Sequence, residues 1–124
     1  MRERLRALPL FADLDDEHLD ALAAATTELQ APAGRTLIER GAPASGVFVL
    51  EQGQAIVEAP EGRRELQAGD VFGERSLVGT EDARTARVRA KTDVRCLAIG
   101  RPAIERLVES YPSVAERLKR LSGE

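Results

Sequence analysis

Short apolar runs separated by glycines constrain the fold of this chain more than any other feature of its sequence. Between residues 27 and 99, β-branched residues such as Val47, Val49 and Val88 recur in stretches of strand length. The runs cover residues 27–31, 35–39, 46–52, 54–58, 64–67, 84–89 and 94–99, and the glycines near their ends include Gly34, Gly41, Gly46, Gly53 and Gly69. Strands of this length with turn signals at this spacing are typical of a small β-sandwich or β-barrel.

The first 25 residues show a helical pattern instead. Arg and Leu alternate in residues 2–8, which predicts a short helix that Pro9 ends or bends. Asp15 is the expected N-cap of a second helix, because its carboxylate can accept from free backbone N–H groups at the helix start. Apolar residues then recur at helical spacing from Leu19 to about Ala25.

Helical spacing returns after Gly100. Pro102 suits the first turn of a helix that runs through Ser110, and Pro112 can begin a last helix. One face of that last helix is apolar and consists of Val114, Leu118 and Leu121. We therefore predict an α+β chain of one domain, residues 1–124, with N-terminal helices in 1–25, a β core in 26–99 and C-terminal helices in 101–121.

Composition excludes several classes of function. The net charge of −3 argues against a nucleic-acid surface in this segment, since such surfaces are usually basic. One histidine, His18, and one cysteine, Cys96, cannot form a zinc site or an internal disulfide. We expect His18 to be solvated and Cys96 to be a buried, unreactive thiol in a reducing cytoplasmic compartment. No apolar run is long enough to span a membrane, and no signal peptide is visible.

The segment from Phe72 to Ala86 contains the residues of this chain that are best suited to binding a ligand. Gly73 allows a ligand to approach the backbone closely. The carboxylate of Glu74 can accept from sugar hydroxyls, and the expected helix start after it offers free N–H groups to an anion. Arg84 adds a planar cationic fork for the same anion. These groups together suit a phosphorylated sugar.

The sequence Phe72-Gly73-Glu74 followed by Leu77, with Arg84-Thr85-Ala86 downstream, resembles the phosphate-binding cassette of cyclic nucleotide-binding domains. These domains are the sensors of catabolite activator proteins, protein kinase regulatory subunits and cyclic-nucleotide-gated channels. The resemblance implies a double-stranded β-helix, a jelly-roll-like barrel, with flanking helices. It also implies a site for cAMP or cGMP, with Glu74 on the ribose 2′-hydroxyl and Arg84 on the phosphate. The implied ligand-binding residues are Phe72, Gly73, Glu74, Arg75, Ser76, Arg84, Thr85 and Ala86.

The segment departs from the family pattern at a few positions. Ser76 stands where the family usually carries alanine, and its hydroxyl can add a phosphate donor. The loop before Arg84 lacks the usual proline and places Glu81 and Asp82 close to that arginine, which weakens anion binding electrostatically. The Thr85 hydroxyl can contact a guanine amino group or the phosphate, so it leaves the choice between cAMP and cGMP open.

The favoured hypothesis is a regulatory sensor without enzymatic activity or cofactor, whose C-terminal helices repack when a cyclic nucleotide binds. Its output would pass to an effector domain or a partner protein. A degenerate sensor fold that serves only protein contacts remains an alternative. An enzyme on a similar barrel is disfavoured, because metal-dependent barrels of that kind need several histidines and no nucleophile is paired with a base.

Overall fold

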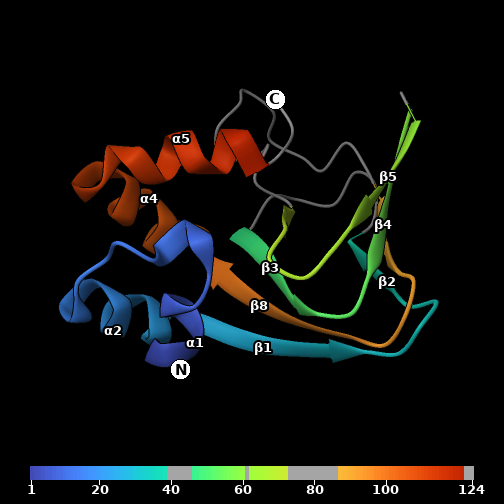
Figure 1. Ribbon diagram of the computed structural model, residues 1–124, viewed down its shortest axis with the longest axis horizontal. Coiled ribbons are helices and arrows are strands. Elements are labelled where there is room, and N and C mark those ends of the chain that lie inside the picture. The colour runs from blue at the N-terminus through green and yellow to red at the C-terminus, as the bar shows by residue number, and fades with distance from the viewer. Residues whose placement is uncertain (39–45, 61, 73–86, 122–124) are drawn as a thin grey trace.

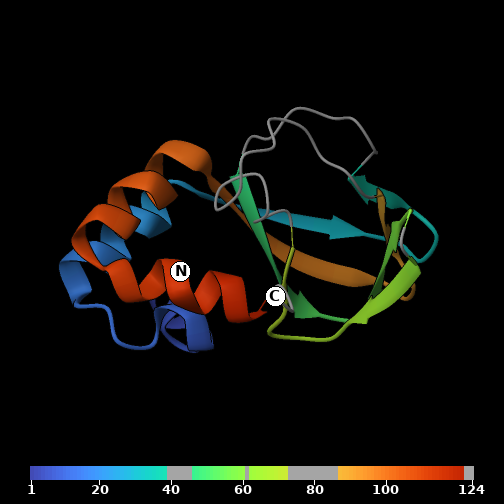
Figure 2. The ribbon, with the colours of Figure 1, turned by 90° about the horizontal axis from the view of Figure 1, so that it is seen from above.

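The computed structural model describes residues 1–38, 46–60, 62–72 and 87–121, with side chains described as far as Leu118. In these residues eight strands form two four-stranded antiparallel sheets, and helices from both chain ends gather beside one of them (Figures 1 and 2). Sheet A has the order β1-β8-β3-β6 and sheet B the order β2-β7-β4-β5. The strands are β1 (Thr26–Ala31), β2 (Thr36–Ile38), β3 (Gly46–Gln52), β4 (Ala55–Ala59), β5 (Gly62–Leu66), β6 (Val71–Phe72), β7 (Arg87–Ala90) and β8 (Val94–Gly100).

The helical layer is built from α1 (Arg2–Arg6), the short 3₁₀ helix η1 (Pro9–Phe11), α2 (Asp16–Ala24), α4 (Arg101–Ser110) and α5 (Pro112–Leu121). Asp15 caps α2, and its side chain accepts from the backbone N–H of His18 at 2.9 Å, as predicted. Pro102 lies in the first turn of α4, and α5 begins at Pro112, also as predicted. None of the helices in the described residues is long and apolar enough to cross a membrane.

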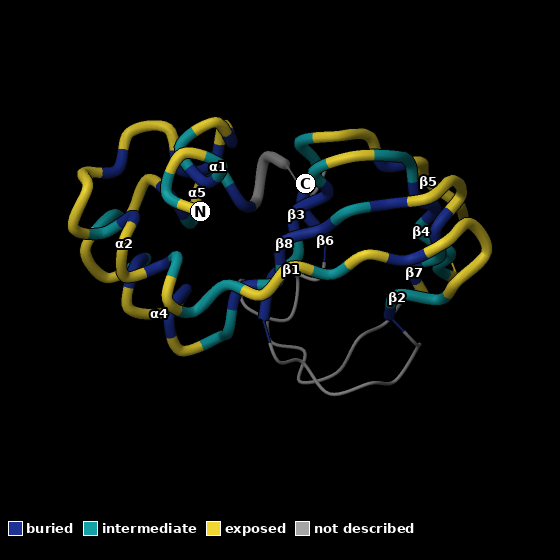
Figure 3. Tube along the Cα trace, turned by 90° about the horizontal axis from the view of Figure 1, so that it is seen from below, coloured by how far each residue is buried: buried dark blue, intermediate teal, exposed yellow. Residues whose placement is uncertain are grey.

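Strands β3 and β8 of sheet A are buried on both faces. Val47 and Val49 of β3 pack toward the helices, whereas Leu50 of the same strand packs toward sheet B. The same alternation places Ile99 of β8 on the helical side and Cys96 on the other. Figure 3 shows that β3 and β8 are buried along most of their length. Burial on both faces explains why these two strands have nearly continuous apolar sequences rather than strict alternation.

Two hydrophobic clusters result. The helical-side cluster joins Leu5, Leu8, Leu10, Phe11, Leu14, Leu19, Leu22, Val47, Val49, Val71, Leu97, Ile99, Ala103, Ile104, Leu107, Val114 and Leu118. The inter-sheet cluster joins Ala31, Ile38, Leu50, Ala55, Leu66, Phe72, Val88, Ala90, Val94 and Cys96. The predicted apolar face of the last helix is confirmed for Val114 and Leu118, which are fully buried, while the side chain of Leu121 lies outside the described residues.

Polar contacts close the rim of the helical-side cluster. Glu51 of β3 accepts from Arg4 of α1 at 2.6 Å and from Arg95 of β8 at 2.9 Å. These two guanidinium groups hold the pKa of Glu51 below its ordinary value, the hydrogen bond from Arg4 being the largest cause. Burial of the side chain, of which 12% is exposed, acts in the opposite direction and is outweighed. Arg117 of α5 pairs with Asp13 and contacts the carbonyl oxygen of Leu10 at 3.4 Å, which ties the last helix to the N-terminal segment.

Several sequence predictions need correction. His18 was expected to be solvated, but it is half-buried, with its Nδ1 2.7 Å from Asp15 and its ring edge-on to Tyr111 at 4.8 Å. Strand β6 was not predicted, because two residues are too few to show a period. The strand expected at 84–89 is observed as β7 from Arg87 to Ala90, and residues 84–86 lie outside the described residues.

The turn between β3 and β4 requires glycine at position 53. Gly53 has φ +91°, and a Cβ there would overlap the carbonyl oxygen of Asp93. Thr92 fastens the same corner, because its hydroxyl accepts from the backbone N–H of Gln54 at 3.0 Å. The predicted glycine turn is thus confirmed here, and it brings the β3–β4 corner against the loop before β8.

Candidate ligand site

Phe72 ends β6 and is the one predicted site residue within the described part of the chain. It is 2% exposed and belongs to the inter-sheet cluster. Its partner across the ladder is Phe48 of β3, and the two rings stack with centroids 5.1 Å apart and an interplanar angle of 12°. The chain is therefore held firmly at the residue before Gly73.

The backbone is also fixed by strand pairing where β7 begins at Arg87, although the Arg87 side chain is exposed. Strand β7 lies inside sheet B and pairs with both β2 and β4. Its second and fourth residues, Val88 and Ala90, are 3% and 2% exposed and pack in the inter-sheet cluster. Phe72 belongs to sheet A and Arg87 to sheet B, so residues 73–86 connect the two sheets.

The remaining predicted site residues lie within that connection, and therefore outside the described residues. They are Gly73, Glu74, Arg75, Ser76, Arg84, Thr85 and Ala86. Their predicted roles in holding a ribose and a phosphate stay predictions. What the structure contributes is the position of the two fixed ends, one in each sheet and both next to the same apolar cluster.

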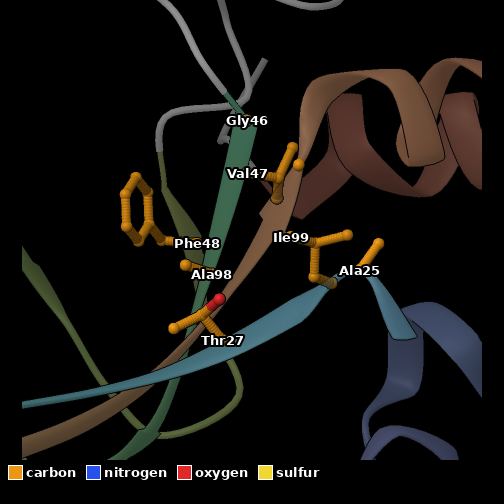
Figure 4. Close-up of a pocket in the computed structure, with 8 residues that line it drawn as sticks. Ala25, Thr27, Gly46, Val47, Phe48, Ala98 and Ile99 are labelled. Carbon is orange, nitrogen blue, oxygen red and sulfur yellow. The ribbon is translucent and has the colours of Figure 1, made fainter. Parts of the chain in front are cut away.

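A hollow of about 240 Å³ lies beside the described end of this site. Figure 4 shows that Phe48 and Val47 leave β3 on opposite sides around it. Thr27, Ala98 and Phe48 occupy one row across β1, β8 and β3, since Ala98 pairs with both of the others. The lining residues are Ala25, Thr27, Gly46, Val47, Phe48, Ala98, Ile99 and Gly100.

The lining determines the chemistry that this hollow can support. Of the described residues that line it, none is charged, and Thr27 supplies a hydroxyl. Such a surface suits contact with an uncharged or apolar group and offers no acid, base or metal ligand. Sequence reasoning missed Phe48 and Ala98 as neighbours of the site, because cross-strand pairing between residues so far apart leaves no local signal.

Cys96 belongs to the same inter-sheet cluster as Phe72. It is fully buried in the inter-sheet cluster, as predicted, and burial raises the pKa of its thiol to about 11. The thiol is therefore protonated at neutral pH and unreactive. Within the described ranges, no group of three or more His, Cys, Asp or Glu side chains is placed to hold a metal ion.

Charged side chains cover the outer face of sheet B. Glu58 of β4 binds Arg87 at 3.1 Å and Arg89 at 3.6 Å, and Lys91 pairs with Glu65. The single negative charge of Glu58 offsets half of the positive charge of the two arginines of β7, where the chain enters the strand from the predicted cassette.

Comparison with known proteins agrees with this architecture. A family model described as the cyclic nucleotide-binding domain matches residues 28–111. The chain is 35% identical over 118 residues to a cAMP-dependent protein kinase regulatory subunit of Aspergillus fumigatus, covering 91% of this chain and 28% of that protein. It is 31% identical over 121 residues to an uncharacterized NTE family protein of Mycobacterium tuberculosis, covering 96% of this chain and 21% of that protein.

A solved structure supports the same conclusion at the level of the fold. The N-terminal domain of a transcriptional regulator from Streptomyces coelicolor superposes with a TM-score of 0.66 at 32% identity, covering 97% of this chain and 89% of that one. The chain belongs to the cyclic nucleotide-binding domain family, a family of regulatory domains. It spans between a fifth and a third of the two curated relatives, so it matches one part of each larger protein.

Proposed function

We propose that residues 1–124 form a regulatory sensor domain that binds a 3′,5′-cyclic nucleotide, cAMP or cGMP. The observation that carries the proposal is the family membership together with the sequence Gly73-Glu74 directly after the fixed Phe72 and Arg84-Thr85-Ala86 directly before the fixed Arg87. Both ends of the cassette segment thus start from rigid strands, as a preorganised binding site requires.

The proposed roles follow from the chemistry of each group. Arg84 binds the cyclic phosphate with its guanidinium fork, and backbone N–H groups after Glu74 complete the anion seat. Glu74 accepts from the ribose 2′-hydroxyl. Ser76 adds a hydroxyl donor, and Thr85 tolerates either purine. The domain does not hydrolyse its ligand, because this group of residues contains no activated nucleophile or base for water.

The proposed response is a repacking of the C-terminal helices, which passes the signal to an effector domain or a partner protein. Support comes from α5, which packs on the N-terminal segment through fully buried Val114 and Leu118 and through the Arg117–Asp13 pair. A change in this packing therefore alters the contacts of the N-terminal segment as well as those of α5. We place the domain in the cytoplasm, where the single buried Cys96 stays reduced.

Isothermal titration of the purified domain with cAMP and with cGMP tests the proposal. We expect binding by the wild type and a loss of about 2–4 kcal/mol in Arg84→Ala, since a charge-assisted bidentate contact disappears. Arg87→Ala is the matched control, because that arginine is three residues away and already pairs with Glu58. A wild-type domain that is folded but binds neither nucleotide would contradict the proposal and favour a module used only for protein contacts.

A further inference from the structure

Strand β1 forms an outer border of sheet A. Among the described residues it pairs with β8 alone, and the sheet order places no strand on its other side. Figure 1 shows β1 along the lower border of the molecule, with no other strand beyond it. In the described part of the chain, no hydrogen bond joins the backbone of Thr26–Ala31 to a strand other than β8. One backbone edge of β1 is therefore open to pairing.

The other edge strands of the two sheets carry features that discourage pairing with another chain. Strand β6 has two residues, and β2 has three residues with an irregular register. Strand β5 exposes three consecutive charged residues, Arg63, Arg64 and Glu65. Short length, irregularity and charge are common means by which proteins block strand edges. Strand β1 lacks them, because its six residues pair with β8 in an unbroken register and include a single charged residue, Glu28.

The charge of Glu28 is already compensated within the chain. Its carboxylate binds Arg4 at 2.9 Å and lies 3.5 Å from Arg95. The other residues of β1 are uncharged, and Thr26 and Thr27 are β-branched, which favours strand structure. The edge thus presents a regular backbone with little electrostatic barrier to a second strand.

A second copy of this chain can extend the edge only in certain registers. In an antiparallel pair related by a two-fold axis, both sheets keep the same face on the same side, so the axis passes between one residue and its own copy. An axis at Glu28 would oppose two carboxylates, which is destabilising. An axis at Gln30 would place Glu28 opposite Pro32, which has no backbone N–H to donate.

An axis at Leu29 avoids both problems. It places Leu29 opposite Leu29 of the second copy, on the face that packs against the inter-sheet cluster. Glu28 then lies opposite Gln30, whose amide can donate to the carboxylate, and Thr27 lies opposite Ala31. The two-fold axis repeats each of these pairs, so residues 27–31 are complementary to themselves.

We propose that β1 pairs antiparallel with β1 of a second copy of this chain, with Leu29 at the two-fold axis. The pairing joins two four-stranded sheets into one. The self-complementary register favours a second copy over an unrelated strand, and the inference does not depend on the proposed function. A ladder over residues 27–31 is small compared with a stable dimer interface, so we expect a dimer that dissociates on dilution.

Site-specific thiol cross-linking tests this register. Leu29→Cys places two thiols directly opposite each other, within reach of a bifunctional reagent that spans about 5 Å. Thr27→Cys is the matched control, because its two thiols would lie about 14 Å apart along the strands. Thr27 is the more exposed of the two residues, so random collisions would favour the control. Cys96 is buried and protonated at neutral pH, and it is present in both variants.

We expect sedimentation of the wild type to show a monomer–dimer equilibrium. Cross-linking of Leu29→Cys should be at least about tenfold faster than that of Thr27→Cys, because opposed thiols have a high effective concentration. A wild type that stays monomeric at every concentration would overturn the proposal, and this measurement needs no substitution. Equal cross-linking rates in two folded variants would overturn it as well.

Gln30→Glu tests the register without a cysteine. It opposes carboxylates at both of the pairs that Glu28 makes across the two-fold axis, so it should weaken the dimer. Sedimentation at several concentrations measures the change, and thermal unfolding checks that the variant is folded. A folded Gln30→Glu variant that dimerises as well as the wild type would contradict the axis at Leu29.

Discussion

The helical-side cluster consists mainly of leucines and is covered by segments from both chain ends, whereas the inter-sheet cluster includes three alanines, Ala31, Ala55 and Ala90, and a cysteine. The first cluster is sealed at its rim by the Glu51 and Arg117 contacts. The second borders the segment predicted to bind ligand, and Phe72 is its one aromatic member. The comparison indicates that apolar burial for stability is concentrated on the helical side, while the inter-sheet side holds the ends of the candidate site.

Phe11→Ala is the substitution expected to have the largest effect. Phe11 is fully buried where η1 meets α5, and removing its ring should cost roughly 3–5 kcal/mol of unfolding free energy. Urea unfolding at pH 7 measures this cost. If the comparison is right, the variant that remains folded binds cyclic nucleotide with unchanged affinity. A strong loss of affinity in the folded fraction would show that the two clusters are coupled.

Leu66→Ala tests the other cluster. Leu66 is fully buried between the sheets, and its truncation should cost roughly 2–5 kcal/mol. Unlike Phe11→Ala, it should also weaken cyclic nucleotide binding, since Leu66 and Phe72 belong to one cluster. Titration under conditions where both variants are at least nine-tenths folded compares them directly. Equal ligand affinities for the two variants would show that the helical-side and inter-sheet clusters do not differ in their influence on ligand binding.

Glu51→Gln tests how the helical-side rim depends on pH. The carboxylate shared by Arg4 and Arg95 should contribute about 1–2 kcal/mol at pH 7. Because folding lowers the pKa of Glu51 from its ordinary 4.5, this contribution is present above about pH 5 and is lost as the pH falls through the folded value. Urea unfolding of wild type and variant from pH 7 to pH 3 should show a gap that narrows below pH 4.5. A constant gap would assign the effect to packing.

Asp13→Asn is expected to have the smallest effect. Asp13 is largely exposed, so the loss of its pairing with Arg117 should cost at most about 1 kcal/mol and less at high salt. The informative readout is hydrogen exchange in α5, where faster exchange confined to Pro112–Leu121 would show that this pair holds the last helix to the N-terminal segment. Unchanged exchange would show that the buried Val114 and Leu118, with the contact from Arg117 to the carbonyl oxygen of Leu10, are enough to hold α5 in place.

The local elements were predictable because their signals are local. Asp15 caps α2, Pro102 and Pro112 stand at the starts of α4 and α5, and the glycine at position 53 turns the chain between β3 and β4. Strand β6 escaped prediction because its two residues gain their place only by pairing with Phe48 and Val49. The partners of His18 escaped it for the same reason, since Tyr111 comes from the far end of the chain.

The sequence alone determined the class of the protein: helices at both ends of a glycine-punctuated β core, and a cassette whose residue types suit a sugar phosphate. Only the tertiary structure decided the strand order, the stacking of Phe48 on Phe72 and the sharing of Glu51 between Arg4 and Arg95. It also decided that neighbouring Arg63 and Arg64 face different sides of the sheet in relation to the core. Periodicity and capping depend on residues within a few positions of each other. These contacts depend instead on which distant segments are packed against one another in the folded chain.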